Sequence, residues 1–114
     1  MRKKILLVDD SRLIVKIAAA YLSRGYEVVT ASSGPEALAM AMSEHPDLIL
    51  MDLNLPGMDG YKVASVLGGN PGTGDVPVVM MTTENEIPKL GGMDYLLKPF
   101  DPTSLLEKVG AYLH

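Results

Sequence analysis

The chain has 114 residues, 47% of them hydrophobic and 21% charged, and predicts a single globular domain over residues 1–114. Its net charge of −4 argues against a nucleic-acid-binding surface, because phosphate backbones require clustered Lys and Arg. Cysteine is absent, which excludes disulfides and thiolate metal sites and is typical of a cytoplasmic protein. No apolar run approaches the ~20 residues of a membrane-spanning helix. We therefore expect neither nucleic acid nor membrane as a direct partner.

Short apolar runs alternate with segments of helical periodicity along the whole chain. In chain order the predicted elements are a strand at 4–9, a helix at 11–24, a strand at 27–32, a helix at 33–44, a strand at 47–53, a helix at 60–68, strands at 76–82 and 94–97, and a helix at 102–113. Such alternation predicts βαβ units, and hence an α/β fold with a parallel sheet and helices on both faces.

Local signals refine the first two predicted helices. Gly25 is expected to cap the C-terminus of helix 11–24, and Ser33 with Glu36 forms a capping-box pattern at the start of helix 33–44. Apolar spacing predicts the buried faces. In helix 11–24 they are Ile14, Ile17, Ala18, Tyr21 and Leu22, and in helix 33–44 they are Ala37, Leu38, Ala41 and Met42.

The segment 84–92 breaks this alternation. Only fifteen residues separate Thr82 from Lys98, and the strand at 94–97 uses several of them. Residues 84–92 contain Pro88 and end in two glycines, so a full crossover helix does not fit. We expect at most one or two helical turns here.

Polar residues whose side chains could bind a ligand or take part in a reaction lie at the ends of four predicted strands. They are Asp9 and Asp10, Asp52, Thr82, and Lys98. In an open parallel sheet the carboxyl ends of the strands meet at one edge, where ligands bind. Three carboxylates, a hydroxyl and an ammonium group are therefore expected in one cleft. Clustered carboxylates favour a hard cation such as Mg²⁺, which keeps several waters and bridges to phosphate oxygens.

Each of these residues also has an ordinary structural interpretation. Asp9 or Asp10 could cap the following helix, although Ser11 is also placed to do so. Asp52 could bind loop N–H groups, and Asp59 is expected only to cap helix 60–68. Thr82 and Thr83 could be turn residues. Taken together, the strand-end positions favour the metal and phosphoryl site.

Four motifs, read in order, resemble the receiver domains of two-component response regulators. They are ILLVDDS at the first strand, LILMDLNLPGMDG at the third, PVVMMTT at the fourth and DYLLKPF at the fifth. The resemblance covers essentially the whole chain and includes the chemotaxis-type single-domain receivers. It implies a flavodoxin-like, doubly wound, five-stranded parallel sheet in the order 2-1-3-4-5, here with a truncated fourth helix.

The resemblance also assigns the phosphoacceptor and the metal ligands. Asp52 would take the phosphoryl group from a phosphohistidine. Asp10 would bind Mg²⁺ directly, and Asp9 would bind it directly or through water. Asn54 matches the position whose backbone carbonyl is a further ligand. The implied cofactor is therefore Mg²⁺, held by Asp9, Asp10, Asp52 and Asn54.

Phosphoryl stabilisation and switching are implied for four more positions. Thr82 and Lys98 would each bind a phosphoryl oxygen. Pro99 matches a position where the Lys–Pro bond is typically cis, and Tyr95 matches an aromatic residue that turns inward when the Thr moves. Thr83 departs from the family, which often has a smaller residue there.

The resemblance predicts a phosphorylation-dependent signalling switch whose donor is a sensor histidine kinase or a phosphotransfer protein. It predicts no enzyme in the metabolic sense, because such a domain catalyses only its own phosphorylation and dephosphorylation. A pseudo-receiver that binds partners without phosphorylation is the alternative. A small Mg²⁺-dependent phosphohydrolase is less favoured, because 114 residues leave no room for a substrate domain.

The short segment 84–92 bears on the output surface. In the family, the fourth helix, fifth strand and fifth helix form the face that dimerises or meets a downstream protein. Shortening the helix is expected to uncover one apolar face of strands 76–82 and 94–97. That face would then be a site for a partner or for self-association.

Overall fold

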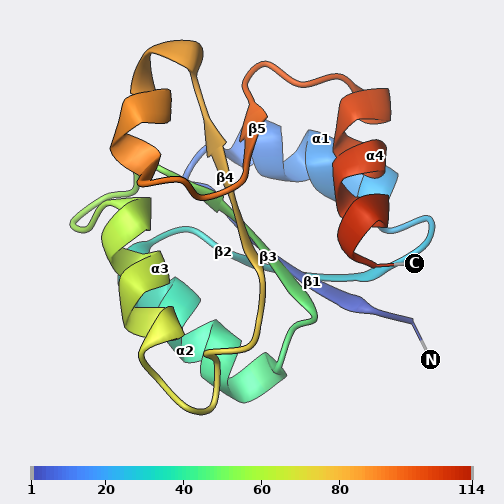
Figure 1. Ribbon diagram of the computed structural model, residues 1–114. Coiled ribbons are helices and arrows are strands. Elements are labelled where there is room, and N and C mark those ends of the chain that lie inside the picture. The colour runs from blue at the N-terminus through green and yellow to red at the C-terminus, as the bar shows by residue number, and fades with distance from the viewer. Residues whose placement is uncertain (1, 114) are drawn as a thin grey trace.

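The computed structural model describes residues 2–113, and Figure 1 shows their arrangement. The strands form one parallel sheet in the order β2-β1-β3-β4-β5, which confirms the predicted fold. They are β1 (Lys4–Val8), β2 (Glu27–Ala31), β3 (Leu48–Asp52), β4 (Val78–Thr82) and β5 (Tyr95–Leu97). The helices are α1 (Arg12–Leu22), α2 (Gly34–Glu44), α3 (Gly60–Gly68), the 3-10 helix η1 (Glu84–Leu90) and α4 (Pro102–Tyr112). Every predicted element is present; the helix at 60–68 has the predicted bounds, and the others are shorter by one or two residues at one or both ends.

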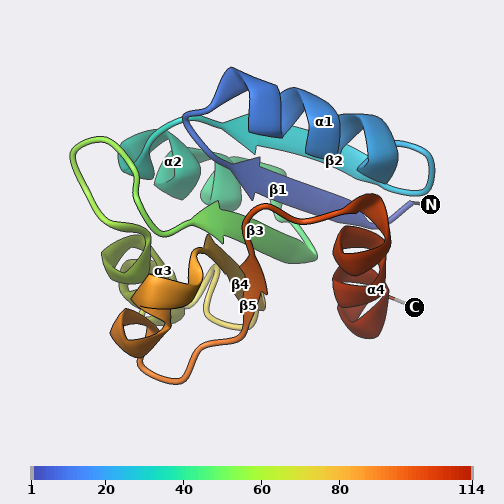
Figure 2. The ribbon, with the colours of Figure 1, turned by 90° about the horizontal axis from the view of Figure 1, so that it is seen from above.

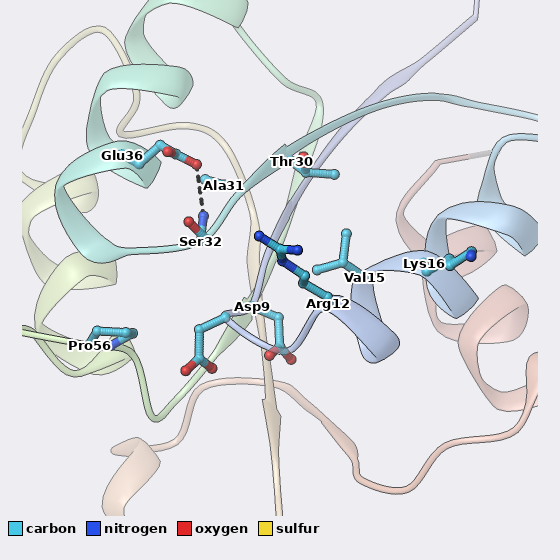
Figure 3. A pocket seen from close by; sticks show the side chains of 10 residues that line it. Asp9, Arg12, Val15, Lys16, Thr30, Ala31, Ser32, Glu36 and Pro56 are labelled. Carbon is cyan, nitrogen blue, oxygen red and sulfur yellow. Dashed lines mark hydrogen bonds between the residues drawn. The ribbon is translucent and has the colours of Figure 1, made fainter.

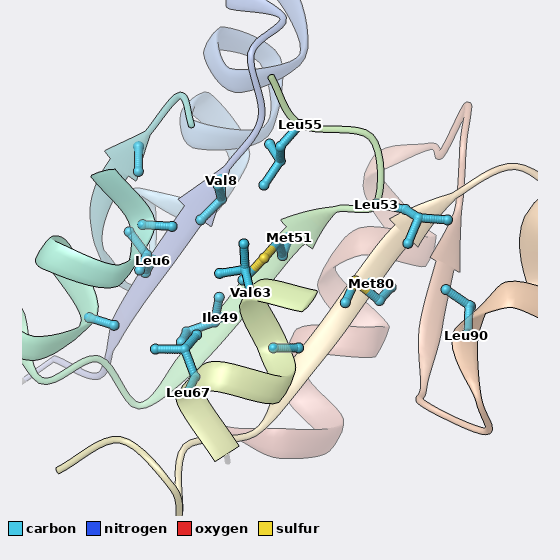
Figure 4. Packing of buried hydrophobic residues seen from close by; sticks show 14 residues of the cluster. Leu6, Val8, Ile49, Met51, Leu53, Leu55, Val63, Leu67, Met80 and Leu90 are labelled. Carbon is cyan, nitrogen blue, oxygen red and sulfur yellow. The ribbon is translucent and has the colours of Figure 1, made fainter. Parts of the chain in front are cut away.

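Helices cover both faces of the sheet and create two apolar clusters. Figure 2 shows α1 and α4 on one side and α2, α3 and η1 on the other. Alternate residues of the central strands enter opposite clusters, as the period of a strand requires. Leu6, Ile49 and Met80 meet α2 and α3 (Figure 4), whereas Ile5, Leu50 and Val79 meet α1 and α4. Within residues 2–113, every helix is too short or too polar to span a bilayer.

The central strand β3 positions the candidate site. All of its residues, from Leu48 to Asp52, are buried, as its apolar composition predicted. It pairs with β1 through Val8 opposite Met51, and with β4 through Met81 opposite Asp52. The carboxyl ends of β1, β3 and β4 are therefore side by side.

Helix ends agree with the sequence patterns at α2 but not at α1. The Ser33 hydroxyl accepts a hydrogen bond from the Glu36 N–H at 3.2 Å, while the Glu36 carboxylate accepts from the N–H of Ser32 rather than Ser33. Gly25 is not a left-handed cap, so that prediction is wrong. Helix α1 ends at Ser23 in right-handed geometry, because backbone N–H groups beyond it bond back to helix carbonyls.

Two residues predicted on buried helix faces are exposed. Ile17 is 44% exposed and Met42 is 53% exposed. The residues that contact the sheet are spaced four apart, at Ala18 and Leu22 in α1 and at Ala37 and Ala41 in α2. Adjacent residues on a helix point about 100° apart. Ile17 and Met42 each directly adjoin a sheet-contacting alanine, so their side chains are directed away from the sheet.

The segment 84–92 is short, as predicted, but it does not uncover β4. Leu90, at the end of η1, is 1% exposed and packs in the cluster that contains Met80, with Met93 beside it. Met80 itself is fully buried. The expected exposed apolar face on β4 is therefore absent, because the side chains of Leu90 and Met93 cover the strand where a longer helix would otherwise lie. On β5, Leu97 remains 40% exposed.

Tyr112 and Asp94 connect the end of α4 to the start of β5. The Tyr112 hydroxyl donates to an Asp94 oxygen at 2.7 Å, and Lys108 donates to the other at 2.9 Å. This hydrogen bond raises the pKa of Tyr112 to about 12. Burial alone would raise the pKa of Asp94, but the bonds from Tyr112 and Lys108 outweigh it and lower that pKa below its usual value.

Tyr112→Phe is expected to lower the free energy of unfolding by about 0.5 kcal/mol at pH 7, a small value because Asp94 is partly exposed. Because the pKa of Asp94 is lower in the folded state, ionised Asp94 stabilises the fold at pH values above the usual carboxyl pKa of 3.8. This stabilisation is lost as the pH falls through the folded-state pKa. Urea unfolding at pH 7 and pH 3 measures this difference. Tyr61→Phe, on an exposed ring, is the control; equal losses in both variants at both pH values would contradict the account.

Candidate functional site

Three carboxylates meet at the carboxyl edge of the sheet. Asp9 and Asp10 follow β1, Asp52 ends β3, and one oxygen from each lies within 4.8 Å of the others. Asp9 is 2% exposed and Asp52 is 7% exposed, while Asp10 faces solvent. The structure thus brings together the three acidic residues that the sequence predicted as metal ligands.

Lys98 places its ammonium group between two of these carboxylates. Its Nζ lies 2.6 Å from Oδ2 of Asp9 and 3.4 Å from Oδ1 of Asp52. The backbone N–H of Lys98 donates to the Thr82 carbonyl at 2.7 Å, which continues the β4–β5 pairing to the sheet edge. The Lys98–Pro99 peptide bond is cis, as predicted. Lys98 therefore belongs to the cluster and not to the outer surface.

Capping is carried out by residues other than the clustered aspartates. The Ser11 hydroxyl accepts from the N–H of Ile14 at 3.3 Å and is the N-cap of α1. Asp9 accepts from the Ser11 N–H at 2.9 Å, which fixes the turn between β1 and α1. Asp59 caps α3 by accepting from the N–H of Lys62 at 2.8 Å, as predicted.

The surroundings of Asp52 favour a cation. Burial raises its pKa above the usual carboxyl value, and the Asp9 charge adds to this rise. The N–H of Asn54, at 3.1 Å from Oδ1, and the Lys98 charge oppose it. All donors offered by Asp9, Asp10 and Asp52 are oxygens, the ligand type that Mg²⁺ prefers. This donor set fits the predicted metal.

Thr82 ends β4 at this edge and Thr83 follows it, whereas Tyr95 begins β5, at the end of that strand away from the edge. Thr82 is 2% exposed, and its hydroxyl has a long contact of 3.4 Å to the Thr83 carbonyl oxygen. Thr83 is exposed. Tyr95 is half-buried and lies opposite Met80 in the β4–β5 register. Thr82 and Thr83 are therefore at the edge, Tyr95 lies beside the middle of β4, and the roles of all three in switching stay predictions.

Glu86 contacts the site and was not identified from the sequence. Its carboxylate Oε1 accepts from the side-chain amide of Asn54 at 2.7 Å. This bond holds the pKa of Glu86 below its usual value, with a further contribution from Lys89. An acidic residue in an irregular segment carries no periodic signal, so only the folded structure reveals the contact.

Gly60 is a second residue whose importance only the structure shows. A Cβ placed there would overlap the backbone carbonyl oxygen of Asp52 and crowd Leu53. The start of α3 can therefore approach β3 only if this position has no side chain. The close approach sets the path of the loop that follows Asp52.

Gly60→Ala is expected to lower the free energy of unfolding by about 2 kcal/mol, because the added methyl group meets backbone that cannot rotate away. Chemical denaturation measures the loss. Gly68→Ala is the matched control on the same helix, since a Cβ at Gly68 would meet no atom within 4 Å. Equal stability of the two variants would contradict the close approach.

A pocket of about 550 Å³ adjoins the acidic cluster on the β1–β2 side. Its lining includes Asp9 and Asp10, together with residues from the starts of α1 and α2. Figure 3 shows the Arg12 side chain above Asp9, and the hydrogen bond that the Ser32 N–H donates to the Glu36 carboxylate. The pocket reaches Asp9 and Asp10 of the cluster, whereas Asp52 is not among its lining residues.

Comparison with known sequences places the chain among two-component regulators. Residues 5–110 match the family described as Response regulator receiver domain. The chain is 42% identical over 120 residues to the alkaline phosphatase synthesis transcriptional regulatory protein PhoP of Bacillus subtilis, covering 99% of this chain and 49% of PhoP. It is 40% identical over 119 residues to the probable transcriptional regulator ycf27 of Cyanophora paradoxa, covering 98% and 48%. The chain thus spans about half the length of these relatives.

Solved structures agree with the sequence comparison. The chemotaxis response regulator CheY4 of Vibrio cholerae superposes with a TM-score of 0.88 at 34% identity, covering 99% of this chain and 100% of CheY4. The receiver domain of a Pseudomonas aeruginosa sensor histidine kinase, with a magnesium ion coordinated in its active site cleft, gives a TM-score of 0.88 at 31% identity and 98% coverage of both chains. The chain belongs to the response-regulator receiver domain family.

Proposed function

We propose that this receiver domain is a Mg²⁺-dependent switch that accepts a phosphoryl group on Asp52 from a histidine kinase or a phosphotransfer protein. The observation that carries the proposal is the convergence of Asp9, Asp10 and Asp52 within 4.8 Å, with Lys98 against two of them. A purely structural cluster gains nothing from three acidic groups facing one cationic side chain. A site that binds a cation and a phosphoryl group needs such an excess of charge.

Asp52 is the nucleophile in the proposed reaction. The contacts from Asn54 and Lys98 both fall on its Oδ1, so Oδ2 is the oxygen available for attack. Oδ2 forms a bond to phosphorus as the nitrogen–phosphorus bond of phosphohistidine breaks, and the electron pair leaves with the imidazole nitrogen. Lys98 and Thr82 stabilise the charge on the transferred oxygens. A bound Mg²⁺ supplies further neutralisation of those oxygens.

Phosphorylation is proposed to act by a population shift. Thr82 is buried at the end of β4, and its hydroxyl has only the weak contact to Thr83 noted above, so little resists its movement toward a phosphoryl oxygen. Such a movement would vacate space beside β5 for the half-buried ring of Tyr95. The surface over η1 and β5 would then change.

The output contact is proposed over η1, β5 and α4, where a downstream protein or a second copy would bind. Leu97 of β5 and Leu106 of α4 are 40% and 39% exposed, which supplies apolar area there. Phosphodonor and output partner are both expected to be proteins of the cytoplasm. Catalysis is proposed to extend only to the domain's own phosphorylation and dephosphorylation.

Phosphotransfer from a purified, radiolabelled histidine phosphotransfer domain tests the proposal. Label is expected to move to the wild type and to Asp59→Asn in Mg²⁺, and not to Asp52→Asn or to any variant in EDTA. Asp59 is the matched control because it is a carboxylate that caps α3 outside the cluster. Absence of transfer together with absence of beryllofluoride binding would indicate a pseudo-receiver. Sustained hydrolysis of p-nitrophenyl phosphate would indicate a phosphohydrolase.

A further inference from the structure

A hydrogen bond joins the short helix η1 to the loop that follows Asp52. Glu86 lies within η1, and its side chain is only 18% exposed although it carries a charge. Its Oε1 accepts from Nδ2 of Asn54 at 2.7 Å, and the Thr83 hydroxyl lies 3.4 Å from the same oxygen. Lys89 lies 3.5 Å from Oε2. The proposed reaction gives Glu86 no task.

Asn54 connects Glu86 to the reacting carboxylate of Asp52. While the side chain of Asn54 donates to Glu86, its backbone N–H donates to Oδ1 of Asp52 at 3.1 Å. An exposed asparagine side chain would otherwise sample several rotamers, and its loop would share that freedom. A charge-assisted bond of this length is among the stronger hydrogen bonds in proteins. It therefore restrains the loop at the residue that contacts Asp52.

We infer that Glu86 is a positioning residue that acts through Asn54. By holding the Asn54 side chain, it keeps the Asn54 N–H on Oδ1 of Asp52, so that Oδ2 is presented to the phosphodonor. The inference deepens the proposed function and rests on it for the kinetic effect, whereas the restraint on the loop exists without any phosphoryl group. In metal sites, mutation of a residue that orients a ligand without touching the metal typically lowers metal affinity or activity by roughly 10- to 100-fold.

The alternative is that the hydrogen bond between Asn54 and Glu86 only stabilises η1. That role would change the unfolding temperature of a Glu86 variant but leave residue 54 undisturbed. A double-mutant cycle separates the two, because a residue that acts through Asn54 loses its effect once the Asn54 side chain is gone. The variants are Asn54→Ala, Glu86→Ala and the double substitution. Glu86→Gln keeps a hydrogen-bond acceptor without the charge, and Glu84→Ala is an exposed control on the same helix.

Two measurements are made on each variant. Amide chemical shift and hydrogen exchange at residue 54 report the loop in the metal-free protein. The rate constant for phosphorylation by acetyl phosphate in Mg²⁺, followed by intact mass, reports the reaction. Glu86→Ala is expected to speed exchange at residue 54 and to slow phosphorylation about tenfold. Asn54→Ala should have the same two effects, and the double variant should show no larger effects than either single variant. Glu86→Gln should have smaller effects, and Glu84→Ala should change neither the exchange nor the phosphorylation rate.

Either of two results overturns the inference. One is an unchanged amide and rate in Glu86→Ala; the other is a double variant whose loss equals the product of the single losses. If the wild type takes no phosphoryl group at all, the proposed function fails, and exchange at residue 54 alone decides whether Glu86 holds the loop. The unfolding temperature of each variant identifies any that fails to fold, in which case Glu86→Gln carries the test.

Discussion

Lys98→Met is expected to lower the free energy of unfolding by about 3 kcal/mol in the absence of divalent cations. The substitution leaves the Asp9 carboxylate, whose side chain is 1% exposed, without the ammonium group that lies 2.6 Å from it. The cost of an unpaired buried charge exceeds the usual cost of losing a hydrogen bond. Chemical denaturation in EDTA measures it, with Lys62→Met, on an exposed helix position, as the control.

The same variant should also lose phosphoryl chemistry. Removing a charged group that stabilises a transition state typically costs roughly 10²- to 10³-fold in rate, and phosphorylation of Lys98→Met by acetyl phosphate is expected to fall by that amount. Mg²⁺ should restore part of the stability, because a second cation can neutralise the same carboxylates. Stability equal to that of Lys62→Met would show that Asp9 does not depend on Lys98.

Magnesium is expected to raise the free energy of unfolding of the wild type by about 2.7 kcal/mol at 100 times its dissociation constant. Asp52→Asn should lose most of this gain, because it replaces one of three clustered carboxylates with a neutral amide. Asp59→Asn should keep the gain, since Asp59 only caps α3. Thermal unfolding across a Mg²⁺ titration makes the comparison, and equal gains in Asp52→Asn and wild type would place the ion elsewhere.

In the absence of metal, Asp52→Asn should be more stable than the wild type. Burial raises the pKa of Asp52, so its ionised form costs the folded state free energy at neutral pH. This cost is fully present above the folded-state pKa and disappears below the usual carboxyl value of 3.8. Asp52→Asn is therefore expected to be more stable than wild type at pH 7 in EDTA, and the difference should vanish as the solution is acidified.

The fold was predictable because its strongest signals are local. Five apolar runs separated by helical segments admit few arrangements once crossovers must be right-handed. The sheet order itself came from the family resemblance. The convergence of Asp9, Asp52, Thr82 and Lys98 follows from parallel strands, whose carboxyl ends share one edge. Each of these residues stands directly at a strand end, so the sheet alone brings them together.

Other features depend on contacts that no local pattern encodes. Ile17 and Met42 fit the apolar period of their helices, yet each helix contacts the sheet through residues spaced four apart, which leaves both side chains exposed. The coverage of Met80 by Leu90 depends on how η1 folds back over the sheet. The bond between Asn54 and Glu86 joins residues 32 apart, in a loop and an irregular helix where hydrophobic periodicity gives no information.

Intact-mass analysis after incubation with acetyl phosphate is the most direct test of the proposed Mg²⁺-dependent phosphorylation of Asp52. One added phosphoryl group is expected on the wild type and on Asp59→Asn in Mg²⁺. No added group is expected in EDTA or on Asp52→Asn. An unmodified wild type that also fails to bind beryllofluoride, or an adduct that persists on Asp52→Asn, would contradict the proposal.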